Sequence, residues 1–346
     1  MTDTPRRGVH RRTADGDWPP PPVPDAAALS AAWEIVSAAH PPTAMTWSYT
    51  LSDLAGRNVH LKLEGTSAVR SFKFRGALVA VAAVAAELPG RPIVTASTGN
   101  HGQGIAFAGR RQGLEVIVCS PETVLPEKKE AMESLGATVV MAGSSLTEAE
   151  DRAREIAAGR GGVYLEDGES ADLMAGAATV VMEMLDEQPD LEAIVVPVGG
   201  GNLVAASLLA VAAAGSTATV VGVQSIEAPG ATLSWLAGTI VRSGCHTYAG
   251  GLATERPGEL ALSVMTGLLD TMVVVTDDDL RKLSGWAFRS LGLVVEGAAA
   301  AGLAALRLYP DAIAGDRIGI VLSGSWLSAN QLDEGLALGE MPAQPA

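Results

Sequence analysis

Short apolar runs alternate with longer amphipathic stretches along most of the chain. The apolar runs are rich in Val, Ile and Leu and have the length of buried strands, about four to eight residues. They predict strands at 59–64, 92–97, 115–120, 137–142, 193–198, 218–224 and 318–322. The stretches between them predict helices at 25–40, 71–87, 100–112, 126–135, 146–159, 202–214, 277–291 and 297–308.

This alternation is typical of an α/β fold, in which helices cover both faces of parallel sheets. A single doubly wound sheet of about eight or more strands would be large, so two stacked sheets are the better prediction. Residues 1–25 are rich in Arg, Asp and Pro and show no periodicity. They predict a flexible N-terminal tail.

The composition narrows the class of protein further. The 346 residues are 48% hydrophobic and 18% charged, which is a globular composition. The net charge of −15 argues against binding to nucleic acid, whose affinity comes from neutralised phosphates. Cys119 and Cys245 form neither a disulfide framework nor a metal spacing, which suits a reducing compartment. No uncharged apolar stretch reaches membrane-spanning length, so we expect a cytoplasmic protein without a membrane partner.

Polar or glycine-rich turns follow four of the predicted strands. They are Ser71–Gly76, Ser97–Gly104, Gly199–Leu203 and Ser323–Ser325. In open α/β sheets, ligands bind where the carboxyl ends of strands meet, so the four turns predict one site. The first turn contains Lys73. A lysine amine desolvated in such a cleft forms Schiff bases with carbonyl compounds, although a solvated lysine opening a helix is the alternative.

Taken in order, the four turns resemble those of the fold-type II enzymes that use pyridoxal phosphate (PLP). The chain is most similar to the branch of threonine and serine dehydratases and serine racemase. The resemblance runs from about Pro41 to about Glu334. Three further segments support it, namely Gly250–Thr254, Pro257–Leu260 and Val294–Ala298.

The resemblance implies two parallel-sheet α/β domains of the tryptophan synthase beta-like architecture. A small domain, residues 92–168, would be inserted in a large PLP-binding domain made of residues 26–91 and 169–340. PLP would lie in the cleft between the two domains. The resemblance also suggests a homodimer that acts on a small amino-acid substrate.

The resemblance further implies roles for individual residues. Lys73 would bind PLP and move the Cα proton, and Thr98 occupies the position of a proton-transferring hydroxyl in serine racemases. The other implied cofactor ligands are Phe72, Asn100, Gly199, Gly200, Gly201, Asn202, Leu203, Glu296 and Ser323. The implied binding loop for the substrate carboxylate consists of Ser97, Thr98, Gly99, Asn100 and His101.

Physical chemistry supports several of these roles, and each has a plainer alternative. Glycines at a helix start let backbone N–H groups converge on a phosphate, but they also favour a simple tight turn. Ser97 is equally a natural helix N-cap. Glu296 at a predicted helix start is also a natural partner of the helix dipole.

Ser323 would face the pyridine nitrogen of PLP. A serine hydroxyl is neutral and does not stabilise a protonated ring as a carboxylate does. The ring then withdraws electrons less strongly, so rapid loss of a β-substituent is favoured over transamination.

The chain departs from the family pattern at several places. The usual Ser-Gly-Gly-Asn end is Ser323–Trp326, and Ala175–Thr179 replaces a commoner Ala-Gly-Gln-Gly-Thr. Gln224 stands where a cation-binding glutamate is frequent, so no metal site is predicted. Gly250 stands where an aspartate is common. These departures leave the amino-acid substrate open.

These observations predict a PLP-dependent lyase, an ammonia-lyase or dehydratase that removes the β-group of a threonine- or serine-like amino acid. The products would be a 2-oxo acid and ammonia. The alternatives are β-replacement, racemisation of an amino acid, and a PLP-fold binder without turnover. A nicotinamide-binding fold is disfavoured, because Gly199–Gly201 lacks the spaced glycine fingerprint.

Overall fold

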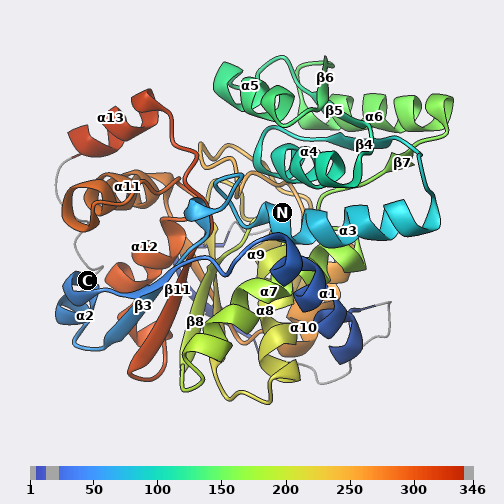
Figure 1. Ribbon diagram of the computed structural model, residues 1–346. Helices are drawn as coiled ribbons and strands as arrows, with labels where there is room; N and C mark the ends of the chain where they lie inside the picture. Colours follow the sequence, from blue (N-terminus) through green and yellow to red (C-terminus); the bar gives the residue numbers. More distant parts are fainter. Residues whose placement is uncertain (1–4, 13–22, 339–346) are drawn as a thin grey trace.

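The computed structural model describes residues 5–12 and 23–338, and its strands form two sheets (Figure 1). The larger sheet has the order β1-β10-β9-β8-β11-β3-β2. Its strands are β1 (Gly8–Arg11), β2 (Met45–Trp47), β3 (Asn58–Leu63), β8 (Ala193–Pro197), β9 (Thr219–Ser225), β10 (Thr271–Val275) and β11 (Arg317–Leu322). The smaller sheet, β6-β5-β4-β7, contains β4 (Ile93–Ala96), β5 (Val116–Ser120), β6 (Thr138–Met141) and β7 (Val163–Tyr164).

Parallel pairing dominates both sheets. All strand pairs of the smaller sheet are parallel, and so are the pairs from β10 through β9, β8 and β11 to β3. Only the edge strands β1 and β2 pair antiparallel with their neighbours. The predicted α/β class with two parallel sheets is therefore confirmed.

Helices cover both faces of the larger sheet (Figure 1). One apolar core lies beneath α1, α7, α8 and α10 and extends to α3 and α4, while a second lies beneath α11 and α12. A third packs α6 against the smaller sheet. The helices are α1 (Ala26–Ala39), α2 (Tyr49–Ala55), α3 (Lys73–Glu87), α4 (Asn100–Gln112), α5 (Pro126–Ser134), α6 (Leu146–Arg160), α7 (Ala171–Glu187), α8 (Asn202–Ala213), α9 (Gly230–Ala237), α10 (Glu259–Leu268), α11 (Asp277–Leu291), α12 (Ala301–Leu308) and α13 (Ala329–Ala337).

Helix α3 connects the two sheet layers. It packs against α4, which belongs to the smaller sheet, and against α7, which covers the larger one (Figure 1). Its sequence suits this place, because alanine and valine fill most of its length and residues 74–81 are all buried. Small side chains allow close approach of neighbouring helices. Lys73 is the first residue of α3, so the packing of this helix fixes the position of the Lys73 backbone.

The structure corrects the expectation of a flexible tail over residues 1–25. Residues 8–11 form β1, which pairs antiparallel with β10 along the edge of the larger sheet. Asp25 caps α1 by accepting a hydrogen bond from the Ala28 N–H at 2.8 Å. Residues 1–4 and 13–22 lie outside the described part of the chain.

Other differences concern elements that the pattern did not predict. They are β2, α2, β7, α7, α9, α10, β10 and α13. The helix expected at 297–308 begins only at Ala301, after a turn. Within residues 5–12 and 23–338, no helix is both long and apolar enough to cross a lipid bilayer.

Candidate active site

The predicted turns lie at the carboxyl ends of parallel strands and contact one another. Lys73 follows β3, and Ser323 follows the neighbouring strand β11. The Phe72 N–H donates to the Ser323 carbonyl at 3.0 Å, and Ser71 forms a β-bridge with Gly324. The turns before Lys73 and after β11 are thus joined by backbone hydrogen bonds.

The turn that presents Lys73 is held by its own polar groups. Ser67 Oγ accepts a hydrogen bond from the Ser71 N–H at 3.1 Å and donates to the Ser71 carbonyl at 2.8 Å. Arg70 has a φ of 58°, an uncommon conformation for a residue other than glycine. Its carbonyl accepts from the Ser325 N–H at 2.9 Å. The chain therefore holds a strained turn to place Lys73 at the start of α3.

Lys73 Nζ contacts a carboxylate from the loop after β7. It donates to both oxygens of Asp167, at 2.6 and 2.7 Å. Burial acts to raise the pKa of Asp167, but Lys73 and then His101 outweigh it and lower that pKa to about 2. Because the Asp167 side chain is 41% exposed, water screens the pair and its contribution to stability is small. The Phe72 ring centroid lies 5.3 Å from the same Nζ.

His101 lies behind this pair and is buried. Its Nδ1 is 3.5 Å from Asp167 Oδ1, and its Nε2 is 3.0 Å from Thr95 Oγ1. Thr95 Oγ1 donates its own proton to the Leu165 carbonyl, so Nε2 acts as the donor toward it. Desolvation lowers the pKa of His101. In the neutral imidazole this leaves Nδ1 unprotonated, so His101 contacts Asp167 without donating a hydrogen bond to it.

The loop between β4 and α4 presents backbone N–H groups at a helix start. Ser97 Oγ accepts from the Gly99 and Gly102 N–H groups at 3.0 and 2.9 Å. The Ser97 side chain is thus engaged as a cap, which was the plainer alternative for it. Thr98, by contrast, is exposed and lines a cavity of about 250 Å³. Gly99 precedes α4 and brings the loop close to Lys128.

Asn100 joins this loop to the segment before α12. Its Nδ2 donates to the two oxygens of Glu296 at 3.0 and 3.3 Å. Burial raises the pKa of Glu296, although Lys128 and the Asn100 hydrogen bond act in the opposite direction. Glu296 is therefore a buried acceptor that orients the Asn100 amide, not a dipole partner at the first turn of α12.

The glycine loop between β8 and α8 has backbone geometry that side chains would disrupt. Gly201 has a φ of 90°, and a Cβ there would stand 2.9 Å from Met265 Sδ. A Cβ on Gly199 would stand 2.6 Å from the Gly251 carbonyl oxygen. Asn202 starts α8, and the Leu203 side chain is buried in the core. The loop thus presents the N-terminus of α8, the kind of site that binds phosphate groups.

Several buried polar atoms around these turns make no hydrogen bond within the described residues. Among them are Asn100 Oδ1, Asn202 Oδ1 and Thr254 Oγ1. Orphaned buried polar atoms are rare and point to a missing partner. Thr254 Cγ2 is 3.8 Å from the Cβ position of Gly200, so its side chain lies against the glycine loop. A phosphate at α8 and a hydroxyl beside Asn100 are the partners that PLP would bring, so the residues fit this cofactor.

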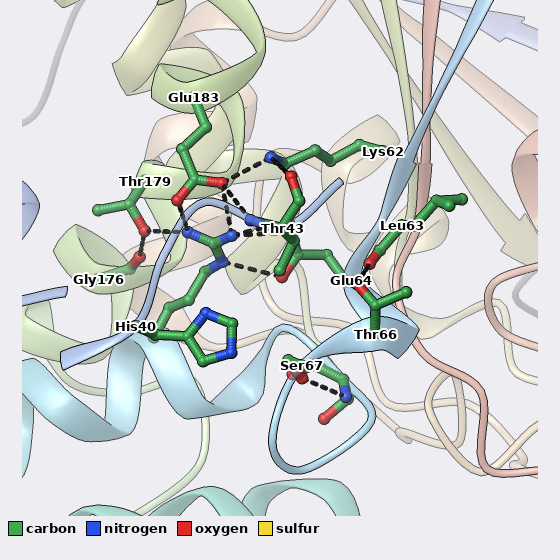
Figure 2. Close-up of polar contacts among 12 residues, drawn as sticks. His40, Thr43, Lys62, Leu63, Glu64, Thr66, Ser67, Gly176, Thr179 and Glu183 are labelled. Atoms are coloured by element: carbon green, nitrogen blue, oxygen red, sulfur yellow. Dashed lines mark hydrogen bonds and ion pairs between the residues drawn. The ribbon is translucent and has the colours of Figure 1, made fainter. Parts of the chain in front are cut away.

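A buried network of charges fixes the helix that carries Lys73. Arg75 donates to Glu64 at 2.8 and 3.0 Å and to Glu183 at 2.6 and 2.7 Å. Lys62 also pairs with Glu183. Figure 2 shows the side chains of Glu183 and Lys62 lying together beside Thr43. Burial opposes the charge on Arg75, but the two carboxylates keep its pKa above the usual value. The network joins β3, α3 and α7 two residues from Lys73.

The departures from the family pattern have structural counterparts. Thr179 accepts from Arg75 Nη1 at 3.1 Å, which places it in the charged network. Trp326 Nε1 donates to the Val69 carbonyl at 3.0 Å, so the altered end of the fourth turn supports the Lys73 turn. Gln224 Oε1 accepts from the Thr232 N–H and Oγ1 at 2.8 and 2.7 Å. In the described part of the chain, no three His, Cys, Asp or Glu side chains gather as a metal ligand set.

The sequence pattern did not single out three residues that the structure places here. Asp167 follows the two-residue strand β7, which is too short to leave a periodic signal. Thr254 belongs to a segment that supported the resemblance, but nothing in the sequence marked its hydroxyl. Lys128 lies on α5 and reaches the site only through the fold.

Comparison with known proteins identifies the class that this fold and site define. The family model described as pyridoxal-phosphate dependent enzyme matches residues 36–324. The chain therefore belongs to this family, within its threonine dehydratase and serine racemase branch, and its cofactor is PLP.

Particular relatives are similar over most of the chain. An L-threonine ammonia-lyase of Thermotoga maritima is 32% identical over 84% of this chain and 73% of its own length. An L-threo-3-hydroxyaspartate ammonia-lyase of Saccharomyces cerevisiae is 29% identical over 82% of this chain and 87% of its own.

Solved structures give the same picture. A threonine deaminase isoform of Solanum lycopersicum has a TM-score of 0.83 at 27% identity, covering 95% of this chain and 98% of that one. A PLP-dependent aspartate racemase has a TM-score of 0.84 at 27% identity, covering 91% and 99%.

Proposed function

We propose that this protein is a PLP-dependent ammonia-lyase that removes the β-substituent of a β-hydroxy or otherwise β-substituted α-amino acid. The products are a 2-oxo acid and ammonia. The main observation behind the proposal is that Lys73, the Asn100 loop and Ser323 all lie at the carboxyl ends of parallel strands, where the two sheet layers adjoin. The names of the relatives, L-threonine and L-threo-3-hydroxyaspartate ammonia-lyase, support it.

The residues around this edge divide into those that hold the cofactor and those that hold the substrate. Lys73 would anchor PLP, with Phe72 beside it and Asn100 hydrogen-bonded to its ring hydroxyl oxygen. Gly199, Gly200, Gly201 and the backbone of Asn202 and Leu203 would hold the phosphate, with the Thr254 hydroxyl as a further donor. Glu296 orients Asn100, and Ser323 would face the ring nitrogen.

The substrate carboxylate binds to backbone N–H groups of the loop from Ser97 to His101. Lys73 Nζ would act as the base that takes the Cα proton. When bound, PLP supplies an electron sink that stabilises negative charge at Cα. Asp167 orients the Lys73 side chain, and the neutral Ser323 hydroxyl favours departure of the β-group over transamination.

One observation favours a second activity. Thr98 is exposed and lines the cavity, and its hydroxyl would return a proton to the face of Cα opposite Lys73. The similarity to the aspartate racemase agrees with this reading. Racemisation predicts solvent deuterium exchange at Cα that Thr98→Ala abolishes. β-Replacement predicts a new amino acid when an amine or thiol is added.

We also propose the domain division, oligomer and location. Residues 92–168 form the small domain, because all strands of the smaller sheet lie within them, and residues 26–91 with 169–340 form the large domain, to whose sheet β1 adds an edge strand. Trp47 and Tyr49 are 49% and 69% exposed, which suits an apolar contact in a homodimer. Cys119 and Cys245 are unpaired, as expected in the cytoplasm. Analytical ultracentrifugation tests the dimer.

Borohydride reduction followed by peptide mapping tests the anchor. A pyridoxyl group on Lys73 is expected, and a tag on another lysine contradicts the assignment. Release of ammonia from β-substituted amino acids tests the activity. A bound cofactor whose visible band no amino acid perturbs would indicate a binder without turnover.

A further inference from the structure

One side of the cavity beside Thr98 carries a cation that the proposed chemistry does not use. The cavity measures about 250 Å³ and is lined by residues of both sheet layers, among them Lys128, Gly250, Glu296 and Trp326. Lys128 lies on α5 and is half-buried. Among the cavity-lining residues it is the only one with a positive charge.

The Lys128 ammonium lies between two backbone segments of the site. Its Nζ is 3.3 Å from the position that a Cβ on Gly99 would take, and 3.7 Å from that of a Cβ on Gly250. Its charge also reaches Glu296, whose pKa it acts to lower against the effect of burial. Lys128 therefore faces the space between the Ser97–His101 loop and the Gly250 segment.

Within residues 5–12 and 23–338, no carboxylate oxygen lies within ion-pair distance, 4.0 Å, of Lys128 Nζ. The adjacent Lys129 differs, because it pairs with Glu133 at 3.1 Å on the helix surface. The cavity-facing lysine thus lacks the counter-ion that its neighbour has. A half-buried ammonium beside a cavity is stabilised by an anion that enters the cavity.

Glycine at position 250 offers Lys128 Nζ no carboxylate in direct contact, and the charge of Glu296 acts on it from beyond ion-pair distance. A Cβ added at this position would meet nothing nearer than Lys128 Nζ, at 3.7 Å, and the φ of Gly250 lies outside the left-handed region. An aspartate there would place its carboxylate against the ammonium. With glycine, the same space is available to a carboxylate of the substrate.

We propose that Lys128 is a specificity-determining residue that binds an anionic group on the β-carbon of the substrate. This inference rests on the proposed function and names its substrate class: α-amino acids with an acidic side chain, such as a β-hydroxy amino dicarboxylic acid. The backbone N–H groups of the Ser97–His101 loop bind the α-carboxylate, and Lys128 binds the second carboxylate. Gly250 provides the room for it.

A comparison of L-aspartate and L-asparagine binding separates the effect of the charge on the second carboxylate from the effect of ligand shape. They are nearly isosteric, and neither carries a leaving group on Cβ, so both bind without elimination. Isothermal titration of the PLP-loaded enzyme is expected to show at least about tenfold tighter binding of L-aspartate, because a charge-assisted hydrogen bond is replaced by a neutral contact in L-asparagine. Equal affinities would overturn the proposal.

Two variants and one control test whether Lys128 causes the preference for L-aspartate over L-asparagine. Lys128→Met removes the cation, and Gly250→Asp supplies an internal carboxylate that occupies it. Both are expected to reduce the preference for L-aspartate to about twofold or less, because the ammonium no longer meets the ligand. Lys129→Met, the control on the same helix, leaves the preference intact. If Lys128→Met weakens both ligands equally, Lys128 contacts the α-carboxylate and the proposal fails.

Turnover is measured separately, so the two proposals fail in different ways. Ammonia release is compared for L-threonine, L-serine and L-threo-3-hydroxyaspartate. Turnover of L-threonine without a preference for L-aspartate leaves the ammonia-lyase proposal standing and overturns the role of Lys128. A preference that depends on Lys128 without any ammonia release supports the binding role and contradicts the lyase.

Discussion

Lys73 Nζ lies 2.6 Å from Asp167 Oδ1, so the predicted cofactor anchor is held by a carboxylate that comes from the other sheet layer. This contact joins the start of α3 to the loop after β7. His101 Nδ1 lies 3.5 Å from the same oxygen.

The first prediction concerns capture of PLP by the cofactor-free protein. Lys73 must leave Asp167 when its nitrogen bonds to the aldehyde, so Asp167→Asn should accelerate reconstitution. An exposed ion pair contributes about 0.2–1 kcal/mol, which corresponds to a rate increase of up to about fivefold. Stopped-flow absorbance after addition of PLP measures the rate. Added salt should accelerate the wild type but not the variant.

Glu166→Gln is the control for this prediction, since Glu166 pairs with Arg154 at 3.1 Å and does not contact Lys73. Its rate should match that of the wild type. A slower reaction in Asp167→Asn would show instead that the carboxylate assists the capture.

The second prediction concerns the glycine loop. Gly201→Ala forces a side chain into a φ of 90° and against Met265 Sδ, so the loop must move away from its phosphate-binding geometry. We expect PLP to bind at least about tenfold more weakly, at a stability cost of about 1 kcal/mol or more. Fluorescence titration of the cofactor-free protein with PLP measures the affinity.

Gly215→Ala provides a matched control for Gly201→Ala. Gly215 also has a positive φ, 61°, but lies beyond the other end of α8 with no heavy atom within 4 Å of an added Cβ. The control should lose a similar stability and keep its affinity for PLP. Equal loss of affinity in both variants would mean that backbone strain, and not the loop, determines binding.

The third prediction is a pH dependence that comes from Glu296. Burial raises the pKa of this carboxyl above its ordinary value of 4.5 in spite of Lys128 and Asn100. The folded state therefore binds the proton more tightly than the unfolded state, and Glu296 destabilises the fold as pH rises from 4.5 through the raised value. Glu296→Gln removes this charge. Its free energy of unfolding relative to the wild type should increase from pH 5 to pH 8, as measured by urea denaturation without cofactor.

Glu34→Gln, on the exposed side of α1, should show no such trend. A relative stability of Glu296→Gln that falls with pH would reverse the sign and refute the burial argument.

Most strands and helices were predictable because their apolar residues follow a clear period. Exceptions arose where burial hides that period. Helix α7 is buried along most of its length, and Thr179 is the only polar residue between Leu173 and Met182, so this stretch lacks the polar positions of a surface helix. Strand β1 lies at a sheet edge, where pairing with β10 supplies its stability and only Val9 is a large apolar residue. The sequence of a four-residue edge strand is too short to predict which strand it pairs with.

The sequence predicted only those parts of the site that lie in continuous segments of the chain. The Lys73 turn and the glycine loop are continuous segments with a recognisable chemistry. The Lys73–Asp167 pair, the Asn100–Glu296 hydrogen bonds and the approach of Lys128 to Gly250 join residues far apart in the chain. Such distances are set by how the two sheet layers pack, which no local pattern encodes.

The last prediction concerns the buried charges behind Lys73. Arg75→Met leaves Glu64 and Glu183 without their main partner in the protein interior (Figure 2). Breaking a buried ion pair in this way typically costs about 3–5 kcal/mol. In the wild type, hydrogen bonds and charges from Arg75 and Lys62 lower the pKa of Glu183 against the effect of burial. That stabilisation is present above the unfolded pKa and is lost as pH falls through the folded one.

Without Arg75, Glu183 should take up a proton at higher pH, which removes part of the buried charge. The stability lost in Arg75→Met should therefore be largest near pH 7 and smaller near pH 5, as measured by urea denaturation. Arg317→Met is the control, because Arg317 is 43% exposed and its pairs with Asp190 and Glu192 should contribute less than about 1 kcal/mol. A loss in Arg75→Met that equals the control would mean that the network adds little to stability. A larger loss that does not change with pH would contradict the protonation of the buried carboxylate.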